Sequence, residues 1–264
     1  MPLKWHLSQG GLKINMSQPW NLTPAQWSDV LLRGLNPDKL ARRLPNDNSN
    51  PWGATLIEYT KDSETILDLG SGRGQHSAML ALAGKHTTLV DWSLDNIEFS
   101  VKLFESLKMR GTFCRADMLK SLPFKNDTFD TVFSCGVFEY FSDDEIREIL
   151  KEAFRVARKQ VIIMVPNAFS IPYRIGKFYM EKRGTWEWGG ERPFATMKPY
   201  FTAVGCHRIH EVSVAAKTSL NFLTMRGGGF VKGLATTVLR LTDHGQPSLF
   251  KQGYLLITIG QKLQ

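Results

Sequence analysis

The sequence predicts an α/β protein built on a mostly parallel sheet with helices on both faces. Short apolar runs alternate along the chain with segments whose apolar residues recur at helical spacing, which is typical of parallel sheets. The run at 65–69 leads into a turn with three glycines, Gly70, Gly72 and Gly74, and a helical pattern starts at Gln75. A strand, a glycine turn and a helix in this order build a ligand pocket at the carboxyl end of a parallel strand.

Residues 1–50 are expected to form a helical extension that precedes the main domain. Thr23 can cap a helix that begins at Pro24, and a second short helix is expected at 38–44. The extension also holds three tryptophans, which either line a ligand pocket or anchor the segment to the core. They are Trp5, Trp20 and Trp27.

Residues 51–264 are expected to form the main domain, in which strands and helices alternate. Strands are predicted at 65–69, 86–90, 113–117, from Asp130 onward, and at 160–165, 206–214 and 254–260. Helices are predicted from Gln75 to Gly84 with Met79, Leu82 and Ala83 on one face, from Ser93 to near Gly111, at 142–157 and at 230–241. The last of these either packs on the sheet or, as a basic amphipathic helix, lies on a membrane surface.

Residues 166–205 interrupt the alternation directly after the fifth predicted strand. This insertion is rich in aromatic residues and glycine and contains the run from Gly189 to Pro193. Long loops of this kind often cover a binding site. The insertion is therefore expected to form a lid, and the alternative is a surface excursion with a small core of its own.

The residues around the glycine turn separate three ligand classes. A phosphate-binding P-loop ends in Gly-Lys-Ser/Thr, whereas Gly74 is followed here by Gln75. Gln75 also stands where a dinucleotide site has its third glycine, and Asp68 would repel a pyrophosphate at the helix N-terminus. These two residues disfavour a nicotinamide-dependent oxidoreductase. Asp68 suits a ligand that carries positive charge, such as S-adenosylmethionine.

The motifs that follow resemble those of class I S-adenosylmethionine-dependent methyltransferases, specifically the type 11 methyltransferase family. The resemblance covers roughly residues 50 to 170 and implies a Rossmann-like, seven-stranded sheet whose last strand is antiparallel to the sixth. It also implies an enzyme that uses S-adenosylmethionine and releases S-adenosylhomocysteine. The matching stretches are 67–74, 90–93, 116–118, 122–124, 129–132 and 134–140.

The resemblance assigns cofactor-binding roles to the glycine turn and to the acid before it. Asp68 is expected near the methionine ammonium group. Gly70, Ser71 and Gly72 let the backbone approach the ligand closely. Ser134 belongs to the motif after the fourth strand and is included among the cofactor-binding residues.

Two further acids stand at the ends of the second and third predicted strands. Asp91 lies about twenty residues after the first glycine, the interval at which a carboxylate binds ribose hydroxyls. Asp117 is expected to accept a hydrogen bond from the adenine amino group, with Trp92 on the ring face and the Met118 backbone at the ring edge. The alternative for each acid is a helix or turn cap.

No residue is singled out as catalytic by its spacing. Methyl transfer depends mainly on alignment, and a base is needed only where the acceptor must lose a proton. Candidates for such a base are Glu139, Tyr140, His207 and Glu191. His207 and His210 are expected on opposite faces of a strand, so no metal site is predicted.

Charge is unevenly distributed along the chain, whose net charge is +8. Residues 1–150 have 16 Lys and Arg against 19 Asp and Glu, whereas residues 151–264 have 17 against 6. The basic second part suggests an anionic acceptor or surface, and the alternative is that it only keeps the protein soluble.

The favoured function is methylation of an oxygen, nitrogen or carbon atom of a small-molecule metabolite or natural product. The alternatives are a tRNA or lipid-linked anionic acceptor, or a non-catalytic S-adenosylmethionine-binding protein. The oligomeric state is not predicted. The three cysteines form no C-x-x-C pair and no signal-peptide pattern is visible, so a cytoplasmic protein with reduced thiols is expected.

Overall fold

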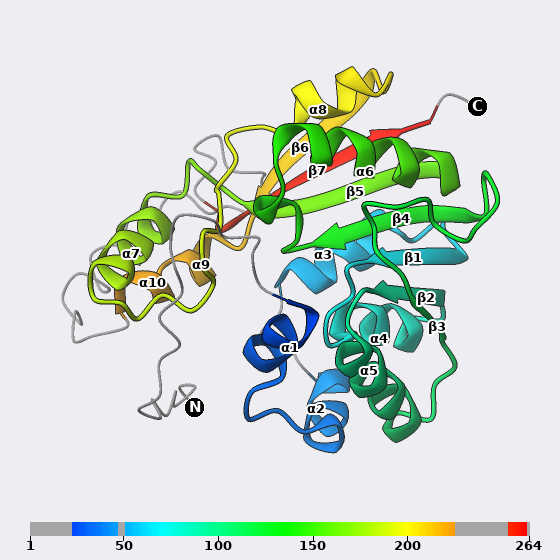
Figure 1. The fold of residues 1–264 in the computed structure, drawn as a ribbon, viewed down its shortest axis with the longest axis horizontal. Helices are drawn as coiled ribbons and strands as arrows, with labels where there is room; N and C mark the ends of the chain where they lie inside the picture. The colour runs from blue at the N-terminus through cyan, green and yellow to red at the C-terminus, as the bar shows by residue number, and fades with distance from the viewer. Residues whose placement is uncertain (1–22, 47–50, 225–252, 263–264) are drawn as a thin grey trace.

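A computed structural model describes residues 23–46, 51–224 and 253–262 and contains a seven-stranded sheet (Figure 1). The strand order is β3-β2-β1-β4-β5-β7-β6, and β7 is antiparallel to both of its neighbours while the other pairs are parallel. The predicted fold class is therefore confirmed, including the antiparallel last strand. The strands are β1 Thr65–Leu69, β2 His86–Asp91, β3 Thr112–Arg115, β4 Phe129–Cys135, β5 Ala157–Pro166, β6 Arg208–Val214 and β7 Leu255–Gln261.

Helices cover both faces of the sheet (Figure 1). One face packs against α3 and α4 through residues such as Ile66 and Ile162, and the opposite face packs against α6 through Leu67 and Val161. Side chains alternate between faces along a strand, so these adjacent pairs point in opposite directions. The helices up to the fifth strand are α1 Pro24–Leu32, α2 Pro37–Arg43, α3 Pro51–Tyr59, α4 Gln75–Leu82, α5 Leu94–Ser106 and α6 Asp143–Val156.

The core helix α6 shows why the local sequence folds as it does. Ser142 and Glu145 form a reciprocal capping box at its start, which satisfies backbone amides that have no partner within the helix. Its apolar residues recur every three to four positions and are fully buried against the sheet, as the sequence predicted. They include Ile146, Ile149, Leu150 and Ala153.

The predicted inner face of α4 was partly wrong. Leu82 is 40% exposed, whereas Ala78, Leu80 and Ala81 are buried. The helix packs on α5 as well as on the sheet, so the buried surface is set by two neighbours and is rotated away from Leu82.

The insertion after β5 contains α7 Ile171–Lys182 and α8 Lys198–Ala203, and two short helices, α9 Ala216–Ser219 and α10 Asn221–Thr224, follow β6. In Figure 1, α8 lies with α6 on one face of the sheet, while α7, α9 and α10 lie together beyond the carboxyl ends of the parallel strands. At the contact between α7 and α10, a Cβ on Gly176 would lie 2.6 Å from the Phe222 carbonyl oxygen. This position therefore requires glycine.

Several expectations fall outside the described residues. They are Trp5, Trp20, residues 47–50 at the end of the expected extension, and the helix expected at 230–241. Within the described residues, no helix is both long and apolar enough to cross a membrane.

Candidate active site

The glycine turn lies at the carboxyl end of β1 and is fixed to the neighbouring strand. The amides of Gly70 and Ser71 both donate to the Val90 carbonyl at 2.9 Å, and the Gly72 amide donates to Asp91 Oδ2 at 2.8 Å. Gly70 and Gly72 have φ values of +79° and +53°, which residues with a Cβ rarely adopt. The turn is therefore held by three backbone amides and depends on glycine at two positions.

Asp68 is buried beneath this turn. It is 3% exposed, and its Oδ2 accepts a hydrogen bond from Ser77 Oγ at 2.7 Å. Burial raises the pKa of Asp68 to about 7, the Ser77 bond opposes the shift, and the charge of Asp91 adds to it. A positively charged ligand group nearby would favour the ionised carboxylate. The expected place beside the methionine ammonium group stays a prediction.

Asp91 is 5% exposed and both of its carboxylate oxygens already accept hydrogen bonds. Oδ1 accepts from the Ser93 amide at 2.9 Å and from Asn96 Nδ2 at 3.1 Å, and Oδ2 accepts from Gly72. An ionised carboxylate has about four acceptor sites, so three donors leave capacity for a ligand. Asp91 is thus a turn cap in the structure, and ribose binding stays a prediction that is compatible with this role.

The residues predicted to surround adenine lie at the ends of β2 and β3. Trp92 is 37% exposed and follows Asp91 directly. Asp117 Oδ1 accepts from the Leu119 amide at 3.0 Å, which makes this acid a partly exposed turn cap as well. Met118 is half-buried, and its Cε lies 3.0 Å from the position that a Cβ on Gly70 would take. Their predicted contacts with adenine remain untested.

Two serines complete the predicted set and differ in role. Ser134 is fully buried, and its Oγ donates to the Leu69 carbonyl at 2.6 Å, so it joins β4 to β1. Ser71 Oγ is buried and has no hydrogen-bond partner among the described residues. A buried hydroxyl without a partner is costly unless a ligand supplies one. This site combines the Ser71 hydroxyl, the backbone of Gly70 and Gly72, and the buried carboxyl group of Asp68. Together they fit a ligand that has both polar groups and a positive charge.

The exit of β4 lies directly beside the glycine turn. Val137 Cγ2 is 2.8 Å from the Cβ position that Gly70 lacks, so a side chain there would collide with it. The short helix η2 Phe138–Tyr140 follows. Glu139 is 2% exposed, and burial together with the charge of Glu191 raises its pKa well above the usual range.

The insertion reaches η2 through Arg192. Its amide donates to the Glu139 carbonyl at 3.2 Å, and its guanidinium donates to Asp143 at 2.7 Å and to the Phe141 carbonyl at 3.0 Å. The preceding residue, Glu191, is 6% exposed and accepts a hydrogen bond from Tyr173. Three candidates for a catalytic base, Glu139, Tyr140 and Glu191, are thus brought together from segments about fifty residues apart.

His207 is not brought to this site. It is exposed and precedes β6, whose first residues are level with the start of β5, at the opposite edge of the sheet from the glycine turn. We therefore exclude His207 as a base. Within the described residues, no group of three histidine, cysteine or acidic side chains has the arrangement of a metal site.

Helix α1 packs against the glycine turn and η2, which the sequence did not indicate. Leu31 lies 3.4 Å from the Cβ position that Gly72 lacks, and Ser28 forms a hydrogen bond with Ser93. Trp27 makes an edge contact with Tyr140 at 4.6 Å between ring centroids. The helical start at Pro24 and its Thr23 cap are confirmed, whereas these contacts join residues too distant in the chain for periodicity to reveal them.

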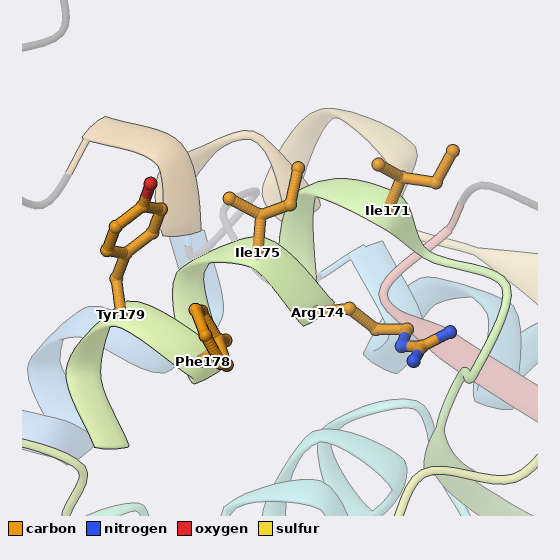
Figure 2. A pocket seen from close by; sticks show the side chains of 5 residues that line it. All are labelled: Ile171, Arg174, Ile175, Phe178 and Tyr179. Carbon is orange, nitrogen blue, oxygen red and sulfur yellow. The ribbon is translucent and has the colours of Figure 1, made fainter. Parts of the chain in front are cut away.

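A shallow apolar groove lies elsewhere, on the outer side of α7. Figure 2 shows the five side chains that line it: Ile171, Arg174, Ile175, Phe178 and Tyr179. The four apolar and aromatic members are between 43% and 58% exposed. None of them is among the residues predicted to bind the cofactor or to act as a base, although all five lie in the insertion that was expected to form a lid.

The central part of the chain is similar to a known protein family. Residues 66–160 match the family model of a methyltransferase domain. This range begins in β1, passes through the glycine turn and both acid-bearing strand ends, and stops within β5. It therefore contains every residue for which a cofactor role was predicted.

Solved structures share the fold at low sequence identity. A methyltransferase from Archaeoglobus fulgidus that depends on S-adenosylmethionine is 17% identical, with a TM-score of 0.54 over 89% of this chain and 97% of that one. The magnesium protoporphyrin IX methyltransferase from Synechocystis, solved with SAH bound, is 15% identical, with a TM-score of 0.53 over 80% and 82%. A Pyrococcus horikoshii protein is 26% identical over 48% of this chain, which spans 61% of its length, with a TM-score of 0.45.

Proposed function

We propose that this chain, whose residues 66–160 form a class I S-adenosylmethionine-dependent methyltransferase domain, transfers a methyl group to an oxygen, nitrogen or carbon atom of a small molecule. The observation that carries the proposal is the contact between the glycine turn that follows Asp68 and the exit of β4 that leads to Glu139: Val137 Cγ2 lies 2.8 Å from the Cβ position that Gly70 lacks. Burial raises the pKa of the Cys135 thiol, and the charges of both acids raise it further. The predicted methionine side of the cofactor site is thus adjacent to the enclosed acids at the exit of β4.

The described residues support a division of roles. Asp68 offers a carboxylate to the amino-acid end of the cofactor, and Asp91 and Asp117 offer acceptors to its nucleoside end. When bound, S-adenosylmethionine supplies an electrophilic methyl group on a sulfonium. The chain's own contribution at the reacting end is to hold the acceptor in line and to keep water away, and alignment alone supplies much of the rate in such displacements.

A small acceptor is favoured because three separate segments enclose the exit of β4. Trp27 from α1 packs on Tyr140, and Arg33 at the end of α1 lies 3.7 Å from Glu187 of the insertion. Arg192 binds the insertion to η2 and to the start of α6. A nucleic acid would need an open, basic approach to the same point, whereas the buried side chains here include Glu139, Tyr140 and Glu191.

The proposal is tested with S-adenosylmethionine carrying a labelled methyl group, purified protein and extract of the source cell. Acid-soluble metabolites, organic-extractable lipids and precipitable RNA and protein are then separated. Label in the soluble fraction supports the proposal, and label in RNA or protein contradicts it. Asp91→Ala is the matched control, because it removes a predicted cofactor contact and should remove label from every fraction.

A lipid-linked acceptor is the second candidate, and the exposed side of α7 favours it. Ile175, Phe178 and Tyr179 are exposed, and Lys182 Nζ lies 4.6 Å from the Phe178 ring centroid. Exposed apolar and basic side chains on one helix suit an anionic lipid surface. Co-sedimentation with vesicles of phosphatidylglycerol and phosphatidylcholine would promote this candidate if Phe178→Ser abolishes it, and label in the organic fraction would be required too.

A non-catalytic cofactor-binding protein and a tRNA acceptor remain alternatives. Binding of S-adenosylhomocysteine without label in any fraction would favour the first. RNA binding that weakens steeply with salt, together with label in RNA, would favour the second and would give a role to the basic residues 151–264. The excess of basic residues is also a reason to consider an anionic small molecule as the acceptor. The charge of the acceptor is independent of its size.

A further inference from the structure

The acids at the exit of β4 face a set of buried aromatic side chains. The charges of Glu139 and Glu191 both raise the pKa of Tyr140, Tyr173 and Tyr254, after burial as the main cause for each. Tyr173 and Tyr254 lie 5.3 Å apart between ring centroids. The two carboxyl groups therefore lie near the same three tyrosines, which come from η2, from α7 and from the position directly before β7.

One oxygen in this region has no hydrogen-bond partner within the part of the chain that the structure describes. Glu139 is only 2% exposed, and its Oε2 forms no hydrogen bond among the described residues. Burying a carboxylate without a hydrogen bond or an opposite charge is strongly unfavourable. Among the described residues, Glu139 Oε2 is thus left without a hydrogen-bond partner at the end of the sheet where the methyl group is expected.

The neighbouring cation does not satisfy both acids. Lys177 lowers the pKa of Glu191 through its charge, but its ammonium group already forms an ion pair with Glu181 on the same helix. Glu191 and Glu181 therefore share one lysine. A cationic group beside Glu139 would lower its raised pKa and favour the ionised carboxylate.

The same region already shows how it holds an ammonium group. Lys177 Nζ lies 4.5 Å from the centroid of the Trp186 ring, which is a cation–π contact. The Trp186 ring also lies near Tyr173, with 6.3 Å between the two ring centroids. Aromatic faces combined with carboxylates are a suitable environment for a second, ligand-borne ammonium group.

We infer that the acceptor carries a cationic nitrogen, and that Glu139 and Glu191 bind it while the tyrosines pack around its apolar part. This inference rests on the proposed function, since it names the chemical class of the molecule methylated at this site. It replaces the anionic acceptor suggested by the basic residues 151–264. Net charge describes long-range association, whereas the buried charges decide which group is stable inside the site.

The test uses three probes of nearly equal shape: benzylammonium, benzyl alcohol and benzoate. Each is titrated calorimetrically into protein saturated with S-adenosylhomocysteine, whose own binding is measured first. Benzylammonium should bind about tenfold or more tightly than the alcohol, because a charge-assisted hydrogen bond to a carboxylate is stronger than one between neutral groups. Benzoate should bind least, because it would face two acids.

Variants show whether the acids cause this preference. Glu139→Gln keeps the shape of the side chain and should reduce the preference for benzylammonium to within about twofold. Glu191→Gln is a second variant with the same expectation, in case the first unfolds. Glu148→Gln is the control, since Glu148 is exposed on α6 and pairs with Lys151; it should leave all three affinities unchanged.

Failure of this inference and failure of the proposed function are distinguishable. Protein that binds S-adenosylhomocysteine but shows no preference for benzylammonium overturns the cationic acceptor alone. A preference that survives both Glu139→Gln and Glu191→Gln also overturns it. Protein that does not bind S-adenosylhomocysteine contradicts the proposed function itself.

Discussion

The main-chain amide of Arg192 donates a hydrogen bond to the main-chain carbonyl of Glu139 at 3.2 Å. This bond joins the insertion after β5 to the exit of β4, and it places Glu191 where its charge acts on Glu139. The insertion is thereby part of the candidate site and not only a surface segment. Its role as a lid over the acceptor remains a proposal.

The Arg192 side chain is predicted to position the insertion against η2 and α6, and not to contact the acceptor itself. Arg192→Met removes the guanidinium bonds to Asp143 and to the Phe141 carbonyl, and benzylammonium binding should weaken several-fold while S-adenosylhomocysteine binding is unchanged. The cost in stability should be about 1 kcal/mol or less, because Arg192 is 40% exposed at its side chain. Calorimetry on both ligands checks this. Arg147→Met, which removes an exposed pair with Asp144, should change neither affinity.

Asp91 is predicted to contribute to both cofactor binding and stability. Asp91→Ala removes the acceptor for the Gly72 amide, the Ser93 amide and Asn96 Nδ2. Affinity for S-adenosylhomocysteine should fall at least tenfold, and the free energy of unfolding by about 1–3 kcal/mol. Calorimetry and urea denaturation measure the two effects. Asp95→Ala, at an exposed position four residues later, is the control, and an unchanged affinity in Asp91→Ala would show that Asp91 does not bind the cofactor.

The Gly70 position is predicted to tolerate no side chain. In Gly70→Ala the new Cβ would meet Val137 at 2.8 Å in a left-handed backbone, so the free energy of unfolding should fall by about 2–5 kcal/mol. Gly84→Ala is a matched control, because Gly84 has φ +83° and nothing within 4 Å of its Cβ position. It should lose only the backbone cost of about 1–2 kcal/mol. Equal losses in urea denaturation would mean that the contact with Val137 relaxes.

Asp68 is predicted to make stability fall as pH rises. Its folded pKa of about 7 lies above its ordinary value of 3.8, so between these values the folded state holds a proton that the unfolded state has released. The free energy of unfolding therefore decreases from about pH 4 to pH 7 through this group.

Asp68→Asn should lack this decrease, because an amide carries no titrating proton. Urea denaturation at steps between about pH 4 and pH 8 compares the slopes of wild type and variant. Asp62→Asn, at an exposed position before β1, should keep the wild-type slope. Parallel slopes for wild type and Asp68→Asn would mean that Asp68 titrates in its ordinary range.

The sequence was sufficient for the sheet and for the cofactor side of the site because both depend on local patterns. Strand β1, the turn at Gly70 and the helix from Gln75 follow one another within about eighteen residues, and periodicity together with glycine positions predicts them. Asp91 and Asp117 stand at strand ends, and parallel strands bring their carboxyl ends to one edge. What the sequence left open is whether these acids bind a ligand or cap a turn, and the structure shows that they do cap.

The acceptor side was not predictable in the same way. Glu139 and Glu191 are 52 positions apart by their numbering, and their proximity depends on how an irregular insertion folds back through Arg192. The contact of Leu31 with the Gly72 position joins the N-terminal extension to the glycine turn. Such contacts arise from tertiary packing and leave no period in the sequence. His207 was wrongly placed among the candidates, because its position in the chain gave no information on which edge of the sheet it occupies.

The position of β7 in the sheet has a consequence for the order in which the chain can fold. Residues 255–261 pair with β5 on one side and β6 on the other, although both of those strands are synthesised earlier. During synthesis β6 has no hydrogen-bonded neighbour until this late segment arrives, and β5 keeps an unpaired edge. Contacts between such distant segments slow folding and leave strand edges open to association with other chains. The nascent protein should therefore be most vulnerable to aggregation just before residues 255–261 emerge.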